Sequence, residues 1–199
     1  ETYTFREMLK QDDCDNFIDA MQVKVDAHQT REHWEIIPRS QMPKEMKTIM
    51  AIWSFKRKRL PDGILNKHKA RLCMHGGMQQ WGVNYWETYA PVVNWISIRF
   101  LLILAELLGL DTMALDFVLA FPQADLDTPI YMEIPVGVSV DGIHQHKKYV
   151  LRLRKNLYGF KQASSNWYAC LKQGLEDQGF KESQSDPCVF IRNDMIILV

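Results

Sequence analysis

Apolar and polar residues repeat with two different periods along the chain, and each change of period marks a predicted helix or strand. Residues 12–28 carry apolar side chains at partly helical spacing, and a strand follows around Trp34. Residues 161–179 carry a second helical stripe, which Gly179 ends because glycine tolerates the left-handed conformation that follows many helices. The pattern therefore predicts one helix near the start of the sequence and another towards its end.

The segment 94–109 is apolar on nearly every side and predicts a buried helix. Asn94 or Ser97 can cap its first turn, and Gly109 can end it. A helix without a polar face is normally covered by protein all round. We therefore expect this helix to lie in a hydrophobic core.

Two strands joined by a tight turn are predicted between residues 52 and 74. Strand-like segments flank Pro61-Asp62-Gly63, a combination typical of a hairpin. Because successive side chains of a strand point to opposite faces, a period of two gathers basic residues on one surface. Five cations share that predicted surface: Lys56, Lys58, Lys67, Lys69 and Arg71.

A carboxylate stands on the polar side of a further predicted strand, residues 111–117. Asp116 points away from the apolar side of this strand, which is formed by Met113, Leu115 and Phe117. Taken alone, an aspartate at the end of a strand often caps the following turn. The same residue type also binds divalent cations.

Two more stretches complete the predicted β structure. Residues 148–157 alternate as a strand does, and residues 188–199 predict a hairpin around Asn193-Asp194. Together with the helices they indicate an α+β protein. At 199 residues and 47% apolar content, the chain is long enough for one ordinary domain with a substantial core, which excludes a disulfide-stapled miniprotein and a disordered tail.

Cysteine spacing and the ends of the sequence bear on its setting. The four cysteines are far apart and form no CxxC pair, which argues against a zinc site and against a disulfide framework. The first residues are charged where a signal peptide is apolar, and Glu106 interrupts the longest apolar run. We expect a soluble, intracellular and cytoplasmic protein with no membrane partner. The apolar ending MIILV suggests that the sequence stops in the middle of a strand.

Equal numbers of basic and acidic residues, 24 of each, hide blocks of opposite charge. Residues 44–71 hold nine basic residues against two acidic ones, a net charge of +7. Residues 111–141 hold six acidic residues and no lysine or arginine, and residues 147–161 hold six basic residues and no acid. Solvated faces can carry such blocks without any partner. The alternative is a groove for a polyanion around a cation-binding centre.

Motifs from about residue 17 onwards resemble the reverse transcriptase domain of Ty1/copia-type retrotransposons. They stand in the family's order: HWEIIPR, IWSFKRKRLPDG, HKARLCMHGGMQQWGVNYWETYAPVV, SIRFLLILAELL, LDFVLAFPQADL, IYMEIPVG, LRKNLYGFKQASSNW and GFKESQSDPCVF. The resemblance implies the fingers and partial palm of a right-hand polymerase fold. Residues 1–32 would be a helical lead-in, residues 33–110 a fingers-like region with the basic hairpin, and residues 111–199 a partial palm.

The resemblance implies template-directed DNA synthesis, which is phosphoryl transfer assisted by two Mg²⁺ ions, with Mn²⁺ as the alternative ion. In the motif similar to LDxxxAF, the first catalytic and metal-binding carboxylate falls on Asp116. Five residues later, Phe121 matches the position that stacks under the incoming sugar and excludes a 2′-hydroxyl. A phenylalanine there is otherwise an ordinary core residue.

Nucleotide-binding roles are implied for several other residues. The hairpin cations Lys56, Lys58, Lys69 and Arg71 resemble fingers residues that grip the triphosphate, although a basic hairpin could instead contact template phosphates. In LYGFKQ, Gly159 would let the backbone approach the substrate and Gln162 could donate hydrogen bonds; a strand-to-helix turn explains both residues equally well. Family members commonly continue Ala-Pro-Arg where this sequence has Ala163, Ser164 and Ser165.

The family places an aromatic-Val-Asp-Asp hairpin directly after a strand resembling MIILV, so the two remaining metal carboxylates are expected beyond Val199. We expect this polypeptide alone not to polymerise. Partners implied by the family are an RNA template, a DNA primer, dNTPs, and the RNase H and integrase of the same polyprotein, inside a cytoplasmic virus-like particle. The competing hypothesis is a non-catalytic, nucleic-acid-binding or inert remnant of a decayed element.

Overall fold

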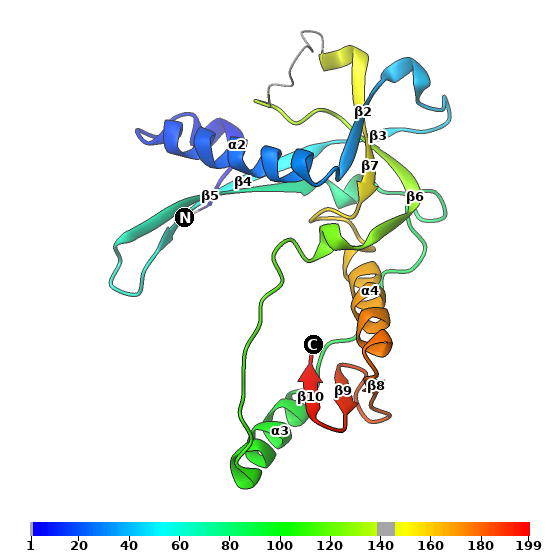
Figure 1. Cartoon of the computed structure of the whole chain (residues 1–199). Coiled ribbons are helices and arrows are strands. Elements are labelled where there is room, and N and C mark those ends of the chain that lie inside the picture. The colour runs from blue at the N-terminus through cyan, green and yellow to red at the C-terminus, as the bar shows by residue number, and fades with distance from the viewer. Residues whose placement is uncertain (1, 139–145) are drawn as a thin grey trace.

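Helices and strands are interspersed in the structure, which is a computed structural model describing residues 2–138 and 146–199. Asp141, the last acid of the acidic block, lies outside the described residues. The helices are α1 (Phe5–Met8), α2 (Cys14–Thr30), α3 (Trp95–Leu108) and α4 (Ala163–Asp177). The strands are β1 (Thr2–Tyr3), β2 (Trp34–Pro38), β3 (Thr48–Ile49), β4 (Ala51–Arg59), β5 (Leu65–Met74), β6 (Asp125–Met132), β7 (Tyr149–Lys155), β8 (Lys181–Glu182), β9 (Val189–Arg192) and β10 (Met195–Leu198). In the described ranges they form sheets of order β1-β4-β5, β2-β7-β6-β3 and β10-β9-β8 (Figure 1).

The predicted basic hairpin is formed by β4 and β5. The two strands pair antiparallel from Ala51↔Met74 outwards, around a turn in which Gly63 adopts a φ of +87°. Helix α2 lies along this hairpin (Figure 1). Its Phe17 ring meets the Phe55 ring of β4 edge to face, with centroids 5.7 Å apart, and both side chains are fully buried. Burial of these aromatic rings fixes α2 to one face of the hairpin and leaves the other face open.

A second sheet joins early and late parts of the sequence. Strand β2 pairs antiparallel with β7 from Trp34↔Leu153 to Pro38↔Tyr149, β7 pairs with β6, and β6 pairs in parallel with β3. The strands predicted around Trp34 and within residues 148–157 are thus confirmed and are direct neighbours. Because strands from both sides of residue 110 share this sheet, it crosses the predicted boundary between regions 33–110 and 111–199, and that division stays a prediction.

The predicted elements at the end of the sequence are confirmed. Helix α4 ends before Gly179, which has a φ of +83°. Strands β9 and β10 form the predicted hairpin, in the register Arg192↔Met195 to Val189↔Leu198.

The four cysteines are unpaired. None of the described helices combines the length and the apolar character that a membrane crossing requires.

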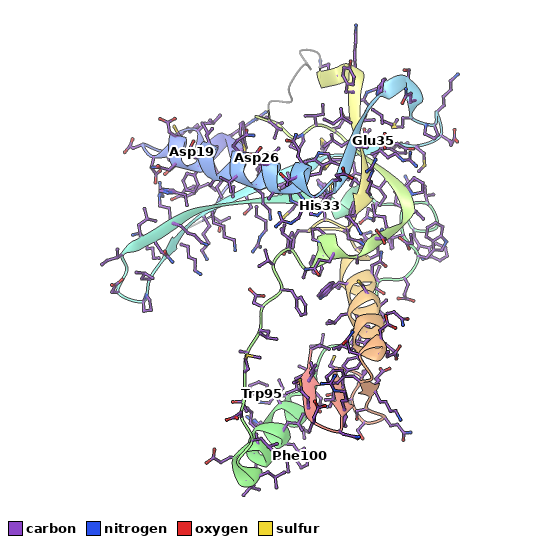
Figure 2. All side chains as sticks on the ribbon, viewed as in Figure 1. Asp19, Asp26, His33, Glu35, Trp95 and Phe100 are labelled. Atoms are coloured by element: carbon purple, nitrogen blue, oxygen red, sulfur yellow. The ribbon has the colours of Figure 1, made fainter. Side chains whose placement is uncertain are left out.

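The prediction that the apolar helix lies in a core is wrong. Its ends are as predicted: the Asn94 side chain accepts from the backbone N–H of Ile96, and Gly109 adopts the left-handed conformation. No residue of α3 is buried, however, and Ile96 and Leu107 are 73% and 76% exposed. Figure 2 shows α3 at the lower end of the molecule, well away from the β2-β7-β6-β3 sheet. The sequence pattern predicts that this segment is helical and apolar. Burial of the helix also requires another element to cover it, and none of the described elements does so.

The predicted strand at residues 111–117 is also wrong. This segment has no regular secondary structure, and Met113 and Leu115 on its apolar side are 80% and 76% exposed. An extended segment becomes a strand only when a neighbour satisfies its backbone N–H and C=O groups. None of the described strands pairs with it, so the alternation of its side chains is not matched by a sheet.

Two buried histidines contact each other where α2 meets β2. The Nδ1 atoms of His28 and His33 are 2.8 Å apart, and the His28 ring stacks on Trp34 at a centroid distance of 5.0 Å. The Nε2 atom of His28 is buried without a hydrogen-bond partner. Burial, reinforced by nearby Lys24 and Arg31, lowers the pKa of His28 to about 3, and burial with Arg31 lowers the pKa of His33 to about 4. The folded protein therefore holds both rings neutral.

Because both pKa values are depressed on folding, stability should fall as the pH is lowered. Unfolded histidines take up protons at about pH 6.5, whereas the folded pair resists protonation down to about pH 4, so the unfolded state gains stability inside that window. We expect a loss of about 2 kcal/mol per histidine between about pH 7 and pH 5 in urea unfolding. His28→Leu should roughly halve this pH dependence, whereas His75→Leu, at an exposed site, should leave it unchanged. If His28→Leu showed the same pH dependence of stability as the wild type, His28 would not be a source of that dependence.

Candidate nucleotide and nucleic-acid interface

Strand pairing gathers the five predicted cations on the face of the β4–β5 hairpin opposite α2. Lys56 lies across from Lys69 and Lys58 across from Lys67, while Arg71 lies across from Ser54. Directly paired residues of antiparallel strands share a face, so the predicted common surface is confirmed. All five side chains are exposed. We call this surface the basic face; it consists of Lys56, Lys58, Lys67, Lys69 and Arg71.

No carboxylate within residues 2–138 or 146–199 forms an ion pair with the basic face. Among the ion pairs of the described residues, none involves any of its five cations. Partial burial lowers the pKa of Lys69, and the charges of Arg71 and then Lys58 lower it further. Like charges held this close repel one another, and a bound anion would relieve that repulsion. The charge of the basic face therefore favours binding of a polyanion.

Two other basic side chains of the hairpin, Arg57 and His68, are anchored on the opposite side. Arg57 donates to both carboxylate oxygens of Asp13, at 2.8 and 2.6 Å, and His68 lies 2.7 Å from Asp13 Oδ2. The Arg57 guanidinium, followed by His68, holds the pKa of Asp13 far below its usual range. Arg57 also donates to the hydroxyl of Tyr3. These contacts tie the N-terminal segment to the hairpin and separate Arg57 from the basic face.

Phe121 and Arg71 both lie close to one tyrosine, Tyr158. Phe121 lies in a short 3-10 helix and is half-buried, with its ring centroid 5.0 Å from that of Tyr158. The Arg71 guanidinium stands 5.9 Å from the centre of the same Tyr158 ring. The structure thus brings together Phe121 and Arg71, which are fifty residues apart in the sequence. Sequence reasoning missed Tyr158, although it belongs to the LYGFKQ motif.

Gly159 allows two backbone segments to touch. Its φ is +93°, and a Cβ atom at this position would lie 2.3 Å from the carbonyl oxygen of Met74 at the end of β5. The Met74 N–H donates to the carbonyl oxygen of Tyr158 at 2.7 Å, which locks the contact. Gly76 meets the same turn from the other side, with its Cβ direction aimed at the Gly159 oxygen. In this structure, the close approach predicted for Gly159 is made to β5; its approach to a substrate stays a prediction.

Gln162 lies inside the protein, beneath the turn that contains Gly159. It is fully buried, accepts from Gln79 Nε2 at 2.8 Å, and donates from its own Nε2 to the Asn84 carbonyl at 2.9 Å. Gln79 in turn accepts from the backbone N–H of Lys161. These bonds hold residues 79–84 against the start of α4. The amide of Gln162 is thus engaged within the fold, and its predicted bond to a nucleotide is not tested by this geometry.

Asp116 lies in the exposed segment 111–117, outside the hairpin that carries the basic face. Two Mg²⁺ ions at a phosphoryl-transfer site are held by a few clustered carboxylates together with water and substrate phosphate oxygens. Nowhere in the described ranges do three His, Cys, Asp or Glu residues cluster closely enough to hold a metal ion. The donor set described here therefore does not fit a two-ion centre, and Asp116 supplies one carboxylate at most.

An open hollow of about 430 Å³ lies between α4 and the segments that flank it. Phe121, Trp167, Leu171 and Cys188 are among its lining residues. Phe121 therefore contacts Tyr158, which lies close to Lys24 and Arg71, and also lines this largely apolar hollow.

The match to known proteins agrees with this surface. The family model described as "Reverse transcriptase (RNA-dependent DNA polymerase)" matches residues 31–199. The chain belongs to the reverse transcriptase family. Its relatives are Pol polyproteins of Ty1/copia-type retrotransposons, which confirms the predicted resemblance. No solved structure matches this reverse transcriptase chain.

Three relatives show how much of the polyprotein the chain represents. The Retrovirus-related Pol polyprotein from transposon TNT 1-94 of Nicotiana tabacum is 34% identical over 203 residues, covering all of this chain and 15% of that relative. The polyprotein from transposon RE2 of Arabidopsis thaliana is 36% identical over 89% of the chain and 12% of its own length. The Transposon Ty1-H Gag-Pol polyprotein of Saccharomyces cerevisiae is 30% identical over 76% of the chain and 8% of its own length. This reverse transcriptase chain thus spans a small part of each relative.

Proposed function

We propose that this chain is the nucleotide- and template-binding part of an RNA-directed DNA polymerase of a Ty1/copia-type retrotransposon. The observation that carries the proposal is the reverse transcriptase match over residues 31–199, a range that contains the whole basic face. The unbalanced cations support it, because phosphate groups of nucleotides and nucleic acids are the polyanions that such an enzyme handles. The right-hand arrangement of fingers and palm is part of the same proposal.

Each side chain takes a role that its position supports. Lys56, Lys58, Lys69 and Arg71 bind phosphate oxygens of the nucleotide or the template, with arginine as a planar fork and lysine as a point charge. Phe121 packs under the sugar of the incoming nucleotide, a position consistent with its half-exposed ring beside Tyr158.

Asp116 contributes one of the carboxylates that phosphoryl transfer requires. Because the described residues do not form a complete metal centre, the proposal assigns the other ligands to the longer polyprotein in which the relatives carry this domain. RNase H and integrase parts of that polyprotein are proposed partners, and the cytoplasm is the proposed compartment.

Primer extension by a chimera tests the polymerase proposal. In this chimera, the chain replaces the matching segment of the tobacco relative. We expect incorporation of dNTPs on a primed RNA template in the presence of Mg²⁺. A folded chimera that binds primed RNA but incorporates no dNTP would contradict the polymerase assignment.

A second candidate function is nucleic-acid binding without polymerisation. It is favoured by the fact that the basic face is complete within this chain, whereas the described carboxylates form no metal cluster. Chimera activity separates the two candidates, since a binding remnant would not extend the primer.

Both candidates predict binding that depends on salt through the basic face. Replacing Lys56, Lys58 and Lys69 together with alanine should weaken binding to a primed RNA duplex and reduce the slope of log K against log salt by about 3, roughly one unit for each lost phosphate contact. Fluorescence anisotropy over a range of salt concentrations measures this slope. A matched variant with three exposed lysines changed elsewhere, Lys147, Lys148 and Lys181, should retain the wild-type slope. Equal slopes in the two triple variants would contradict the assignment of the basic face.

A further inference from the structure

One lysine outside the reverse transcriptase match extends from α2 to Tyr158, the tyrosine that Arg71 also approaches. Lys24 precedes residue 31, where the family match begins. It is half-buried, and its Nζ atom lies 5.9 Å from the centre of the Tyr158 ring. Arg71 stands at the same distance from that ring. Two cations from different elements therefore converge on one aromatic side chain.

The charge distribution of α2 sets Lys24 apart. It is the only lysine or arginine of the helix, whereas the acids Asp19 and Asp26, seven residues apart, share one face (Figure 2). That acidic face is opposite the buried stripe containing Phe17 and Met21, and Lys24 flanks the buried stripe. The helix thus presents acids to solvent and a single cation towards the hairpin.

The surroundings of Lys24 disfavour its positive charge in the absence of a ligand. Partial burial lowers the pKa of Lys24, and the charges of Lys69, Arg31 and Arg71 lower it further. Among the described neighbours, Cys73 in its thiolate form acts in the opposite direction. In the part of the chain that the structure describes, no carboxylate forms an ion pair with Lys24, Lys69 or Arg71. Lys24 and Arg71 approach one ring and Lys69 is close enough to act on the charge of Lys24, so the three cations repel one another unless an anion binds among them.

We infer that Lys24, Lys69 and Arg71 form a phosphate-binding subsite beside Tyr158, to which the N-terminal helix contributes Lys24. This inference rests on the proposed function, which assigns phosphate binding to the basic face. Arg71 offers a planar pair of donors, and the two lysines add point charges from β5 and α2. The ligand is a phosphate group, supplied either by the polyphosphate of a nucleotide or by the backbone of a nucleic acid.

Titration of the 199-residue chain with inorganic tripolyphosphate and with a primed RNA duplex tests the inference. Lys24→Met preserves the apolar stem of the side chain and removes its charge. We expect about a five- to tenfold loss of affinity for at least one of the two probes, as for one charge-assisted hydrogen bond. Lys24→Arg should retain affinity within about twofold. The matched control is Lys10→Met, which removes one exposed lysine just before α2.

The pattern of losses identifies the source of the phosphate and separates the two proposals. A loss confined to tripolyphosphate assigns the subsite to nucleotides, and a loss confined to RNA assigns it to the nucleic-acid backbone. Wild-type affinity in Lys24→Met, combined with a loss in Lys69→Ala, would overturn the inference and leave the proposed function intact. Failure of the unaltered chain to bind either probe would overturn both.

Proton uptake on binding provides a readout that a purely structural role would not change. A phosphate that approaches Lys24 favours its charged form, so binding under alkaline conditions, where part of the Lys24 population has lost its proton, should be accompanied by proton uptake. Calorimetric titrations in two buffers of different ionisation enthalpy measure this uptake. We expect Lys24→Met to take up fewer protons than the wild type, whereas Lys10→Met should match the wild type. Equal uptake in all three proteins would contradict direct contact with the anion.

Discussion

Replacing Gly159 with alanine should destabilise the folded chain by about 2–5 kcal/mol. Left-handed backbone at a residue with a side chain costs about 1–2 kcal/mol, and forcing extra volume into a packed site adds about 1–3 kcal/mol. Both penalties apply, because Gly159 has a φ of +93° and its Cβ atom would lie 2.3 Å from a Met74 backbone oxygen. Backbone atoms at the end of a paired strand cannot move aside as a flexible side chain can. Urea unfolding monitored by tryptophan fluorescence measures the change in free energy.

Gly174→Ala is the matched control for this experiment. Gly174 lies within α4, and a Cβ atom there would meet nothing within 4 Å. Alanine in a helix interior is favoured over glycine by about 0.5–1 kcal/mol, so this variant should be slightly more stable than the wild type. Similar stability changes for the two alanine variants would show that the Gly159 turn does not require glycine.

Asp116→Asn should abolish polymerisation by the chimera with the tobacco relative while leaving nucleic-acid binding unchanged. Asparagine keeps the size of the side chain but removes the negative charge that a metal-binding carboxylate provides. Mutating a residue that only hydrogen-bonds to a metal ligand lowers activity by up to about 100-fold. Asp116 is proposed as a metal ligand itself, so we expect primer extension to fall by at least about that factor. Binding should persist because Asp116 lies outside the hairpin that carries the basic face.

The control for Asp116→Asn is Asp111→Asn, an equivalent change at an exposed residue of the same extended segment. It should retain primer extension close to that of the unaltered chimera. Equal activity in the two variants would remove Asp116 from the catalytic centre, even if the chimera itself polymerises.

Local patterns predicted the parts of the fold that depend on neighbouring residues in the sequence. The Pro-Asp-Gly turn and the alternation around it determine the β4–β5 hairpin and therefore the common face of its cations. Helix α3 begins after Asn94, whose side chain caps its first turn, and ends at Gly109, which adopts the left-handed conformation. Both effects involve only residues close in the sequence. In these cases the sequence contains both partners of each interaction within a few positions.

The wrong predictions concern contacts between distant segments. The apolar pattern of residues 95–108 and the alternation of residues 111–117 indicate which side chains could be buried. These patterns do not identify the surface that would cover them. The same limitation hid the role of Gln162, whose amide partners lie about eighty residues earlier in the chain. Lys24 was missed because the first quoted motif, HWEIIPR, begins after it, although its position as the lone cation of an acidic helix was a usable signal.

The strand order β2-β7-β6-β3 bears on how this protein folds during its synthesis. The two edge strands leave the ribosome first, yet their partners β6 and β7 are completed only at residue 155. The β4–β5 hairpin and α2, whose mutual contacts lie within residues 2–74, can form while the rest is still being translated. Between these two events, β2 and β3 remain unpaired on the nascent chain, exposing backbone groups that other chains could pair with. Slow translation between codons 74 and 155 would therefore lengthen the period in which nascent chains can aggregate.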